Sequence, residues 1–388
     1  MSGRGKRSSA RKSKQPVLFS PKRCKWPASR RTTSCVSSSG RHDTERACGQ
    51  AQPARAVFFA AMKWQVMKVG TAETSFLVTG GSGFVGTWVL RLLLSKGAQV
   101  AVYDVQANRR RWDRVLGADA QRVSFFQGDL VDRARLDQVC EEVGVTHVVH
   151  LGALLTPACQ EDPWLACQVN VLGSVGVFEL VRQREQIQGL AYASSLAVHG
   201  PPPDDPSPVG VEDTFAPSFY GVYKRSVELI ANQYWKHYGL TSFGLRPHVV
   251  YGPERDQGLT AAPSLAARAV AEDRGCEINY TGPAGYDYVE DVALALVRGA
   301  TESPPGAHVV DLPGDEVTPE AIRDLLVELE PSAAGRITVS GPAIPSNAPP
   351  ERRLIQRLFP DWERVALRAG MTRTLEFYGW VNQSESQR

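Results

Sequence analysis

Short apolar runs and longer helical patterns alternate along most of this chain. From about residue 72, runs rich in β-branched and aromatic residues are separated by stretches with helical spacing of apolar positions, which is typical of a parallel sheet with crossover helices. The pattern predicts strands at 76–79, 99–104, 123–127, 147–151, 189–193 and 242–246. Helices are expected to begin near Phe84, Pro163 and Ser218, the last ending before Gly239. The predicted fold class is α/β, a Rossmann-type doubly wound parallel sheet.

The alternation weakens in the C-terminal third. Beyond Tyr251, proline and glycine become frequent and the regular spacing of apolar residues decays. We therefore expect residues 72–250 to form the Rossmann domain and residues 251–388 a smaller lobe. Such a lobe would cover the crevice at the carboxyl ends of the strands, where α/β sheets bind ligands.

The first 71 residues have a different composition from the rest. Residues 1–70 contain 16 Lys and Arg and two acids, a net charge of +14, so the remaining 318 residues carry −11. This Ser- and Arg-rich stretch buries too little apolar surface to offset the entropy of ordering, and we expect a disordered tail. Three interpretations stay open: a mitochondrial or plastid transit peptide, a mis-assigned start with translation beginning at Met62 or Met67, and a basic arm that binds nucleic acid.

The basic cluster at residues 4–14 of the tail lacks interleaved aromatic residues and a reading module, so nucleic acid is not an expected partner. A cytoplasmic location is expected, or an organellar one if the tail is a transit peptide. The seven cysteines are scattered without a CxxC pair, which indicates a reducing compartment and argues against a zinc site or disulfide framework. No metal is expected. No apolar run in the sequence reaches membrane-spanning length, so no membrane partner is expected either.

Residues 79–86 read TGGSGFVG and follow the first predicted strand. Gly80, Gly83 and Gly86 have GxxGxxG spacing and lead into a helix that opens with Phe84 and Val85. Glycines at these positions let the backbone turn sharply and approach a pyrophosphate, whose charge then meets the helix N-terminus. The loop predicts a dinucleotide site.

The second predicted strand ends in Asp104, 24 residues after Gly80. A carboxylate there accepts hydrogen bonds from the adenosine ribose and repels a 2′-phosphate, so the expected cofactor is NAD rather than NADP. The run Arg109-Arg110-Arg111 could in principle hold a phosphate. We interpret it instead as the solvated face of a helix.

Tyr220 and Lys224 lie four residues apart in a helical pattern and therefore share one helix face. A nearby ammonium favours the phenolate, which would bring the tyrosine closer to the working range of a general base. Tyr223 belongs to a separate apolar stripe with Val227, Ile230 and Tyr234. We therefore assign Tyr223 to the core and Tyr220 to the site.

Further motifs make the chain resemble the extended short-chain dehydrogenases/reductases, within the NAD-dependent epimerase/dehydratase family. In order they are the TGGSGFVG loop, Gly128-Asp129-Leu130, His150-Leu151-Gly152-Ala153, Asn170-Val171-Leu172-Gly173, the Ser194-Ser195 loop, the Tyr-Lys pair and LRPHVVYGP at 245–253. The resemblance covers roughly residues 75–297. It implies NAD as cofactor and a carbohydrate as substrate, and it makes a homodimer through two helices per subunit a candidate assembly.

The resemblance also implies site roles. Ser195 would hydrogen-bond the reacting oxygen while Ser194 packs, Tyr220 would take the substrate proton, and Lys224 would hold the nicotinamide ribose. The implied cofactor-lining residues are Asp129, Leu130, Leu151, Gly152, Ala153, Asn170, Pro247, His248 and Val250. Leu154, His248 and Arg255 are weaker candidates for contacts with substrate.

The chain departs from the family's patterns at three points. Leu196 and Ala197 stand where the dehydratases carry an Asp-Glu pair, so a dehydratase is improbable. His199 replaces the tyrosine that is usual before Gly200. Nucleotide-sugar enzymes carry an Arg-Asp pair that anchors a diphosphate, and the alignment places Ala284 and Gly285 there, or Tyr286 and Asp287 if it shifts by two residues, so neither alignment supplies the arginine. A free sugar or sugar acid, with a carboxylate held by Arg255, is therefore a candidate substrate.

Two catalytic hypotheses and one non-catalytic hypothesis follow. A 4-epimerase would oxidise a sugar transiently and return the hydride to the other face, whereas a dehydrogenase would release NADH. The alternative is a non-catalytic NAD-binding scaffold or regulator, which the intact Ser195, Tyr220 and Lys224 argue against.

Overall fold

The computed structural model describes residues 74–200, 216–344 and 354–386. The tail expected at residues 1–71, with its three interpretations, lies outside this range. The described helices and strands follow in chain order. They are β1 Ser75–Thr79, α2 Phe84–Ser95, β2 Gln99–Asp104, α3 Arg109–Val115, η2 Gly117–Arg122, β3 Val123–Gln127, α4 Arg133–Val143, β4 His147–His150, α5 Ala158–Glu161, α6 Pro163–Cys167, η3 Gln168–Leu172, α7 Gly173–Arg182, β5 Gly189–Ala193, η4 Leu196–Val198, α8 Phe219–Tyr238, β6 Ser242–Arg246, β7 Val249–Tyr251, α9 Ala262–Ala271, β8 Cys276–Ile278, β9 Ala284–Tyr288, α10 Val289–Glu302, β10 Ala307–Asp311, β11 Asp315–Val317, α11 Pro319–Leu329, η5 Pro331–Ala333, β12 Ile337–Val339, α12 Leu354–Leu358 and α13 Leu367–Ser386.

A seven-stranded parallel sheet forms the centre of the fold, in the order β10-β6-β5-β4-β1-β2-β3. All six predicted strands are present, with β4 one residue shorter than expected. The three predicted helix starts are confirmed, and Gly239 caps α8 with a left-handed φ of 65°. The predicted Rossmann-type class is therefore confirmed.

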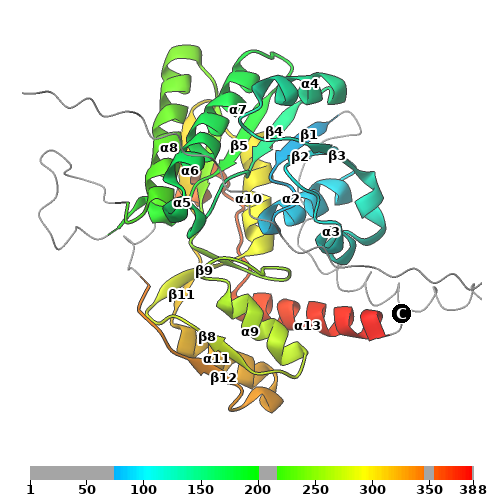
Figure 1. The fold of residues 1–388 in the computed structure, drawn as a ribbon, viewed down its shortest axis with the longest axis vertical. Helices are drawn as coiled ribbons and strands as arrows, with labels where there is room; N and C mark the ends of the chain where they lie inside the picture. Colours follow the sequence, from blue (N-terminus) through cyan, green and yellow to red (C-terminus); the bar gives the residue numbers. More distant parts are fainter. Residues whose placement is uncertain (1–73, 201–215, 345–353, 387–388) are drawn as a thin grey trace, which may run out of the picture. The chain divides into compact units, whose positions relative to one another are not determined.

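Successive side chains of β1 enter different cores, because strand residues alternate between the two faces of a sheet. Phe76 and Val78 pack on the face covered by α2, α3 and α10. Leu77 packs on the opposite face, with apolar side chains of α4, α7 and α8. The helices thus cover both faces of the sheet (Figure 1).

The C-terminal part does not separate from the Rossmann domain at a single boundary. After β9, the buried helix α10 packs against α2, β5 and β6, and β10 pairs with β6 as the seventh strand of the large sheet. Residues 289–311 therefore lie with the large sheet, while the expectation that residues 251–388 belong mainly to the smaller lobe stays a prediction. The smaller lobe comprises the sheet β11-β9-β7, the pair β12-β8, and α9, α11 and α13 (Figure 1).

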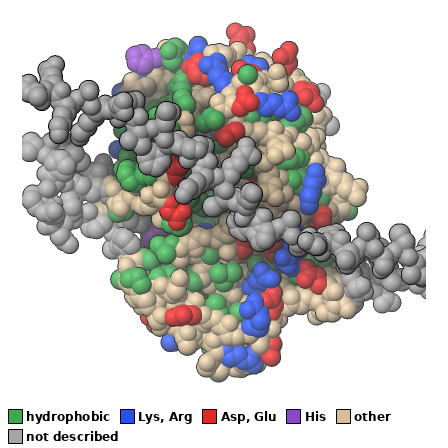
Figure 2. Space-filling view, viewed as in Figure 1, with side chains coloured by type: hydrophobic (Ala, Val, Ile, Leu, Met, Phe, Trp, Pro, Cys, Tyr) green, Lys and Arg blue, Asp and Glu red, His purple; other side chains and the backbone are tan. Residues whose placement is uncertain are grey.

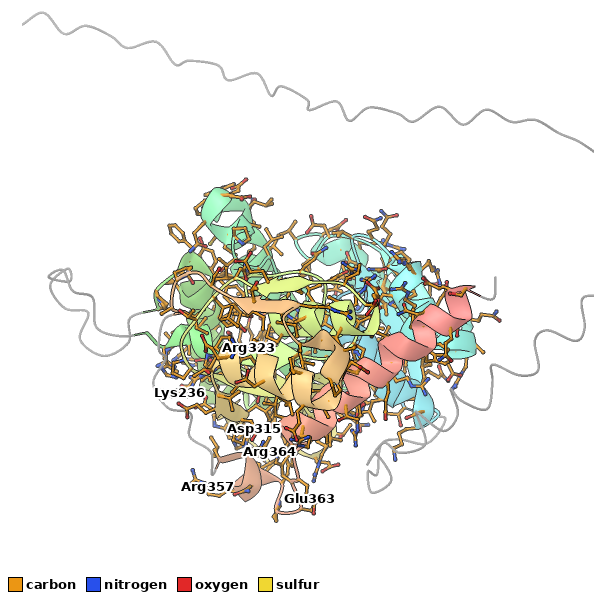
Figure 3. All side chains as sticks on the ribbon, turned by 90° about the horizontal axis from the view of Figure 1, so that it is seen from below. Lys236, Asp315, Arg323, Arg357, Glu363 and Arg364 are labelled. Carbon is orange, nitrogen blue, oxygen red and sulfur yellow. The ribbon has the colours of Figure 1, made fainter. Side chains whose placement is uncertain are left out.

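An ion pair ties the segment before α13 to this lobe. Arg364 Nη1 lies 2.5 Å from Asp315 Oδ2, and the two residues are labelled close together in Figure 3. The same carboxylate oxygen accepts a 2.7 Å hydrogen bond from the backbone N–H of Leu367, the first residue of α13. These contacts fix the start of the C-terminal helix against β11.

One helical stretch, Pro163–Arg182, is long and apolar enough by length and composition to cross a membrane, with a mean hydropathy of 1.5. The expectation that no apolar run has this length is therefore wrong. The stretch consists of α6, η3 and α7, and its Val177, Phe178 and Leu180 side chains are fully buried in the core beside the large sheet. Its α7 part therefore packs in the core, whereas Trp164, Leu165 and Leu172 of α6 and η3 are exposed.

Candidate active site

A cavity of about 1130 Å³ lies at the carboxyl ends of the parallel strands. Its volume slightly exceeds the roughly 300–1,000 Å³ of common ligand pockets, which leaves space for a cofactor and a small substrate together. Nearly all the site residues predicted from sequence line it. They are Gly80, Gly83, Phe84, Val85, Gly86, Asp104, Asp129, Leu130, Leu151, Gly152, Ala153, Leu154, Ser195, Tyr220, Lys224, Pro247, His248, Val250 and Arg255.

The glycine loop is packed so closely that side chains would not fit. Gly80 has a φ of +71°, and a Cβ there would lie 2.6 Å from the backbone nitrogen of Gly152. A Cβ at Gly86 would lie 2.5 Å from the carbonyl oxygen of Gly80. The loop is therefore fixed by backbone packing and leads directly into the N-terminus of α2.

The loop also contains a buried hydroxyl that sequence reasoning missed. Ser82 Oγ is buried and has no hydrogen-bond partner among the described residues, although Ser82 lines the cavity. The first N–H groups of α2 lack partners within the helix and provide further donors beside it. This donor set fits a pyrophosphate, which would accept from Ser82 and from the helix N-terminus.

Asp104 is held at the cavity wall by two backbone donors. Ser82 N donates to Oδ2 over 3.0 Å, and Val105 N donates to Oδ1 over 2.8 Å. A carboxylate oxygen can accept more than one hydrogen bond, so both oxygens retain capacity for ribose hydroxyls. The carboxylate thus stands at the end of β2 where the sequence analysis expects the adenosine ribose.

The solvated face expected for Arg109-Arg110-Arg111 is wrong for Arg111. Its guanidinium is buried and donates to Ser82 O over 2.8 Å and to Asp256 Oδ1 over 2.7 Å. Arg109 and Arg111 both line the cavity, and Arg109 stacks over Trp112 at 5.0 Å. Arg111 therefore joins the glycine loop to the loop that follows β7.

Ser195, Tyr220 and Lys224 meet in the cavity. Ser195 lies just beyond β5, where its Oγ accepts a 3.2 Å hydrogen bond from Ala197 N. Burial raises the pKa of Tyr220 to about 12, while the hydroxyl of Ser195 acts in the opposite direction. The nearby charge of Arg255 also favours the phenolate.

Lys224 lies on the same helix face as Tyr220, as expected, with Nζ 5.8 Å from the phenol ring centroid. Its ammonium donates to Ala193 O over 2.6 Å, and burial lowers its pKa to about 8. Burial has the largest effect on the pKa of Tyr220, and the contribution expected from this ammonium stays a prediction. Tyr223 is buried with its hydroxyl donating to Pro163 O, so its assignment to the core is confirmed.

The adjacent Ser194 faces away from the cavity centre toward a buried ion cluster. Its Oγ donates to Glu228 Oε1 over 2.5 Å, and Arg246 donates to both oxygens of that carboxylate over 2.6 Å. Arg246 Nη1 also lies 3.1 Å from His199 Nε2 and 3.3 Å from Asp311 Oδ1. This cluster fixes the end of β5 and so the position of Ser195.

Two polar residues predicted from the sequence, Asn170 and His248, form hydrogen bonds with backbone groups at the cavity wall. Asn170 does not line the cavity: its amide accepts from Leu154 N over 2.7 Å and donates to Leu154 O over 2.9 Å. It holds the loop after β4 from behind, a role that the motif alone does not reveal. His248 lines the cavity, and its Nδ1 accepts from Gly285 N over 2.8 Å, which fixes a neutral ring with the proton on Nε2.

Comparison with known proteins gives the family. The family model of the NAD-dependent epimerase/dehydratase family matches residues 76–310. This is more than half of the chain, which therefore belongs to that family, and the cofactor of the family is NAD.

Individual relatives are similar over most of the chain. A UDP-glucose 4-epimerase of Mycolicibacterium smegmatis is 28% identical over 316 residues, 78% of this chain and 97% of that protein. The crystal structure of Thermus thermophilus UDP-glucose 4-epimerase in complex with NAD is 26% identical, has a TM-score of 0.65, and is matched over 79% of this chain and 99% of that one. A dTDP-glucose 4,6-dehydratase of Bacillus anthracis in complex with NAD shares the fold, with 21% identity and a TM-score of 0.66 over 81% of this chain and 98% of that one.

Proposed function

We propose that this chain is an NAD-dependent epimerase or dehydrogenase that transfers hydride between a carbohydrate hydroxyl carbon and nicotinamide. One observation carries the proposal: Ser195, Tyr220 and Lys224 share a single cavity with the glycine loop and Asp104. NAD, when bound, supplies the hydride acceptor. Asp104, Ser82 and the N-terminus of α2 would hold its adenosine ribose and pyrophosphate.

The residues of the chain account for the proton that leaves the substrate. Ser195 would donate a hydrogen bond to the substrate oxygen, and Tyr220 would accept the hydroxyl proton as the carbon–hydrogen bond breaks. Bound NAD would accept the hydride from the same carbon, which would leave the substrate as a carbonyl compound. An epimerase reverses these transfers on the other face, whereas a dehydrogenase releases the carbonyl product and the reduced cofactor.

Dehydration is not part of the proposed reaction. The fold alone does not separate the two activities, because a dehydratase shares it. The argument rests on Leu196, which is buried, and on Ala197, which lines the cavity. Neither side chain can move a proton, so water elimination next to Ser195 lacks its acid and base.

The proposed substrate is a carbohydrate without a nucleotide. Ala284 is buried in β9, and Gly285 uses its N–H to bond His248, so neither residue offers a cation for a diphosphate. Arg352 and Arg353, two other arginines that could hold one, lie outside the described residues. Tight binding of a UDP-sugar or GDP-sugar in a calorimetric titration would overturn this part of the proposal.

The test of the activity is a panel of free sugars, sugar acids and nucleotide sugars incubated with the purified protein and NAD. Accumulating NADH indicates a dehydrogenase, and an isomeric product without NADH indicates an epimerase. NAD binding without turnover of any substrate would favour the alternative, a non-catalytic scaffold or regulator.

We also propose a homodimer built on α6, η3 and α8. Apolar side chains stand exposed along these elements, which contact one another. They are Trp164, Leu165, Leu172, Phe219, Val222 and Leu229. Phe219, Val222 and Leu229 share one face of α8 because they are three and seven residues apart. Figure 2 shows hydrophobic side chains at the edge where Figure 1 places α8.

A further inference from the structure

Arg255 faces the cavity without a carboxylate partner among the described residues. Its Nη1 donates to Val250 O over 2.5 Å and its Nη2 donates to Thr260 Oγ1 over 3.0 Å. Its Nε is buried and has no hydrogen-bond partner in the described part of the chain. The guanidinium also lies 5.9 Å from the ring centroid of Phe84. The side chain is thus fixed in place while its charge stays uncompensated.

The two acids beside Arg255 are bound elsewhere. Glu254 pairs with Arg114 over 3.0 Å, with both side chains buried, and Asp256 pairs with Arg111 over 2.7 Å. Both partners belong to α3. Glu254 and Asp256 flank Arg255 in the sequence, but each forms an ion pair with an arginine of α3. Neither carboxylate therefore neutralises the charge of Arg255.

The backbone of this segment is held in an uncommon conformation. Glu254 has a φ of +69°, in the left-handed region that non-glycine residues rarely adopt. Its N–H donates to Tyr378 Oη over 2.7 Å, and Trp88 Nε1 donates to Pro253 O over 3.1 Å. The turn is thus held by α13 through Tyr378 and by α2 through Trp88. Backbone strain persists only where the surrounding structure determines it, and it is typical of functional segments.

From this arrangement we infer that Arg255 binds the carboxylate of the substrate, so that the substrate is a sugar acid. The inference rests on the proposed function and specifies its substrate class. A guanidinium offers a planar fork of donors that matches a carboxylate, and two of its five N–H groups are used by Val250 and Thr260. The remaining donors include the buried Nε–H, which a carboxylate oxygen would satisfy.

The electrostatics of the cavity support an anion at this point. Burial lowers the pKa of Arg255 to about 10, which shows that the cation is poorly compensated where it stands. Arg255 and Tyr220 each shift the pKa of the other, so a carboxylate on Arg255 would lie near the reacting centre. A compact substrate could then reach Ser195, Tyr220 and Arg255 at once.

The test measures binding rather than turnover, in protein that carries Tyr220→Phe and is saturated with NADH. Calorimetry measures the Kd of D-glucuronate, D-gluconate and D-glucose. Each is measured in the protein that retains Arg255 and in the one that also carries Arg255→Met. We expect the acids to bind more tightly than glucose, and Arg255→Met to weaken the acids by about 10- to 100-fold. Arg323→Met is the control, because Arg323 is a surface arginine of α11 paired with Asp324. This variant should leave the Kd of the acids and of glucose unchanged. If Arg255→Met does not fold, the preference of the unsubstituted binding site for acids over glucose decides the question.

Two other results would overturn the inference. Equal binding of acids and glucose by the protein with Arg255 present would contradict it. A loss of NADH affinity in Arg255→Met with the preference for acids intact would assign Arg255 to the cofactor pyrophosphate instead. Because the assay needs no catalysis, a failure of the proposed reaction would appear separately, as full turnover by Tyr220→Phe.

Discussion

At the scale of single residues, neighbouring positions have different surroundings. Ser194 donates to Glu228 in a buried ion cluster, whereas Ser195 lines the cavity with Tyr220. The family resemblance implied this difference, because it assigned the packing role to Ser194 and the site role to Ser195. The contacts of Arg111 were not predictable, since its partner Asp256 lies 145 residues away in the sequence. Residues defined by local motifs were therefore predicted, and those defined by distant ion pairs were not.

Asp104 carries the prediction for cofactor choice. Asp104→Ala removes the carboxylate acceptor for the ribose and the repulsion of a 2′-phosphate. We expect the Kd of NAD to rise about 10- to 100-fold and that of NADP to change less than about 3-fold, as measured by fluorescence titration. Asp113→Ala, an exposed aspartate of α3, is the control. An equal loss for both cofactors would contradict the assignment.

Lys224 makes stability depend on pH. Burial lowers its pKa to about 8, whereas an ammonium in the unfolded chain keeps its proton up to about pH 10.4. Between these values the unfolded state binds more protons, so the contribution of Lys224 to the free energy of unfolding rises with pH and is lost as pH falls through about 8. Urea unfolding at several pH values should show this slope in the native chain and not in Lys224→Met. Parallel curves for the two proteins would rule it out.

At the scale of elements, the sequence pattern predicted six strands of the large sheet but did not predict that a C-terminal segment packs on the same sheet. Six strands were predicted because short apolar runs between helical stretches are distinctive. The return of α10 and β10 to the large sheet was missed, since pairing of β10 with β6 depends on contacts across more than 60 residues. Likewise, the sequence of α3 does not indicate that its Arg111 and Arg114 are buried.

The buried pair of Arg114 and Glu254 should stabilise the fold through α3. Arg114 also pairs with Glu385 of α13, so it connects three segments. Arg114→Met leaves a buried carboxylate without its partner, and we expect the free energy of unfolding to fall by about 3 kcal/mol. Arg110→Met, an exposed position on the same helix, should change it by less than about 0.5 kcal/mol. Similar urea midpoints for both variants would show that the pair contributes little.

At the scale of the whole molecule, the cavity collects side chains from distant parts of the described chain. The large sheet supplies the glycine loop, Asp104 and Ser195, while the segment after β7 supplies Arg255. The proposed homodimer would use exposed apolar side chains of α6, η3 and α8, and α8 also carries Tyr220 and Lys224. Leu229 lies more than two turns beyond Tyr220 and does not line the cavity, so a change there tests assembly.

Leu229 tests the proposed dimer. Its side chain is 55% exposed on α8, and Leu229→Glu would place a charge in the centre of an apolar contact. We expect analytical ultracentrifugation to show a dimer for the native chain and a monomer for this variant. Lys236→Glu, an exposed change near the end of the same helix, should leave the dimer intact. A native chain that sediments as a monomer at micromolar concentration would refute the proposal.

The central claim is that Tyr220 accepts the substrate proton in an NAD-bound cavity. The most direct measurement is turnover of the substrate found in the panel by Tyr220→Phe, together with the Kd of NAD. We predict turnover reduced by at least about 100-fold, with NAD affinity nearly unchanged, because only the proton-accepting oxygen is lost. Tyr223→Phe, three residues along the same helix with its hydroxyl bonded to Pro163 O, should keep turnover within a few-fold of the native value. Turnover by Tyr220→Phe within a few-fold of native would contradict the account and remove Tyr220 from the mechanism.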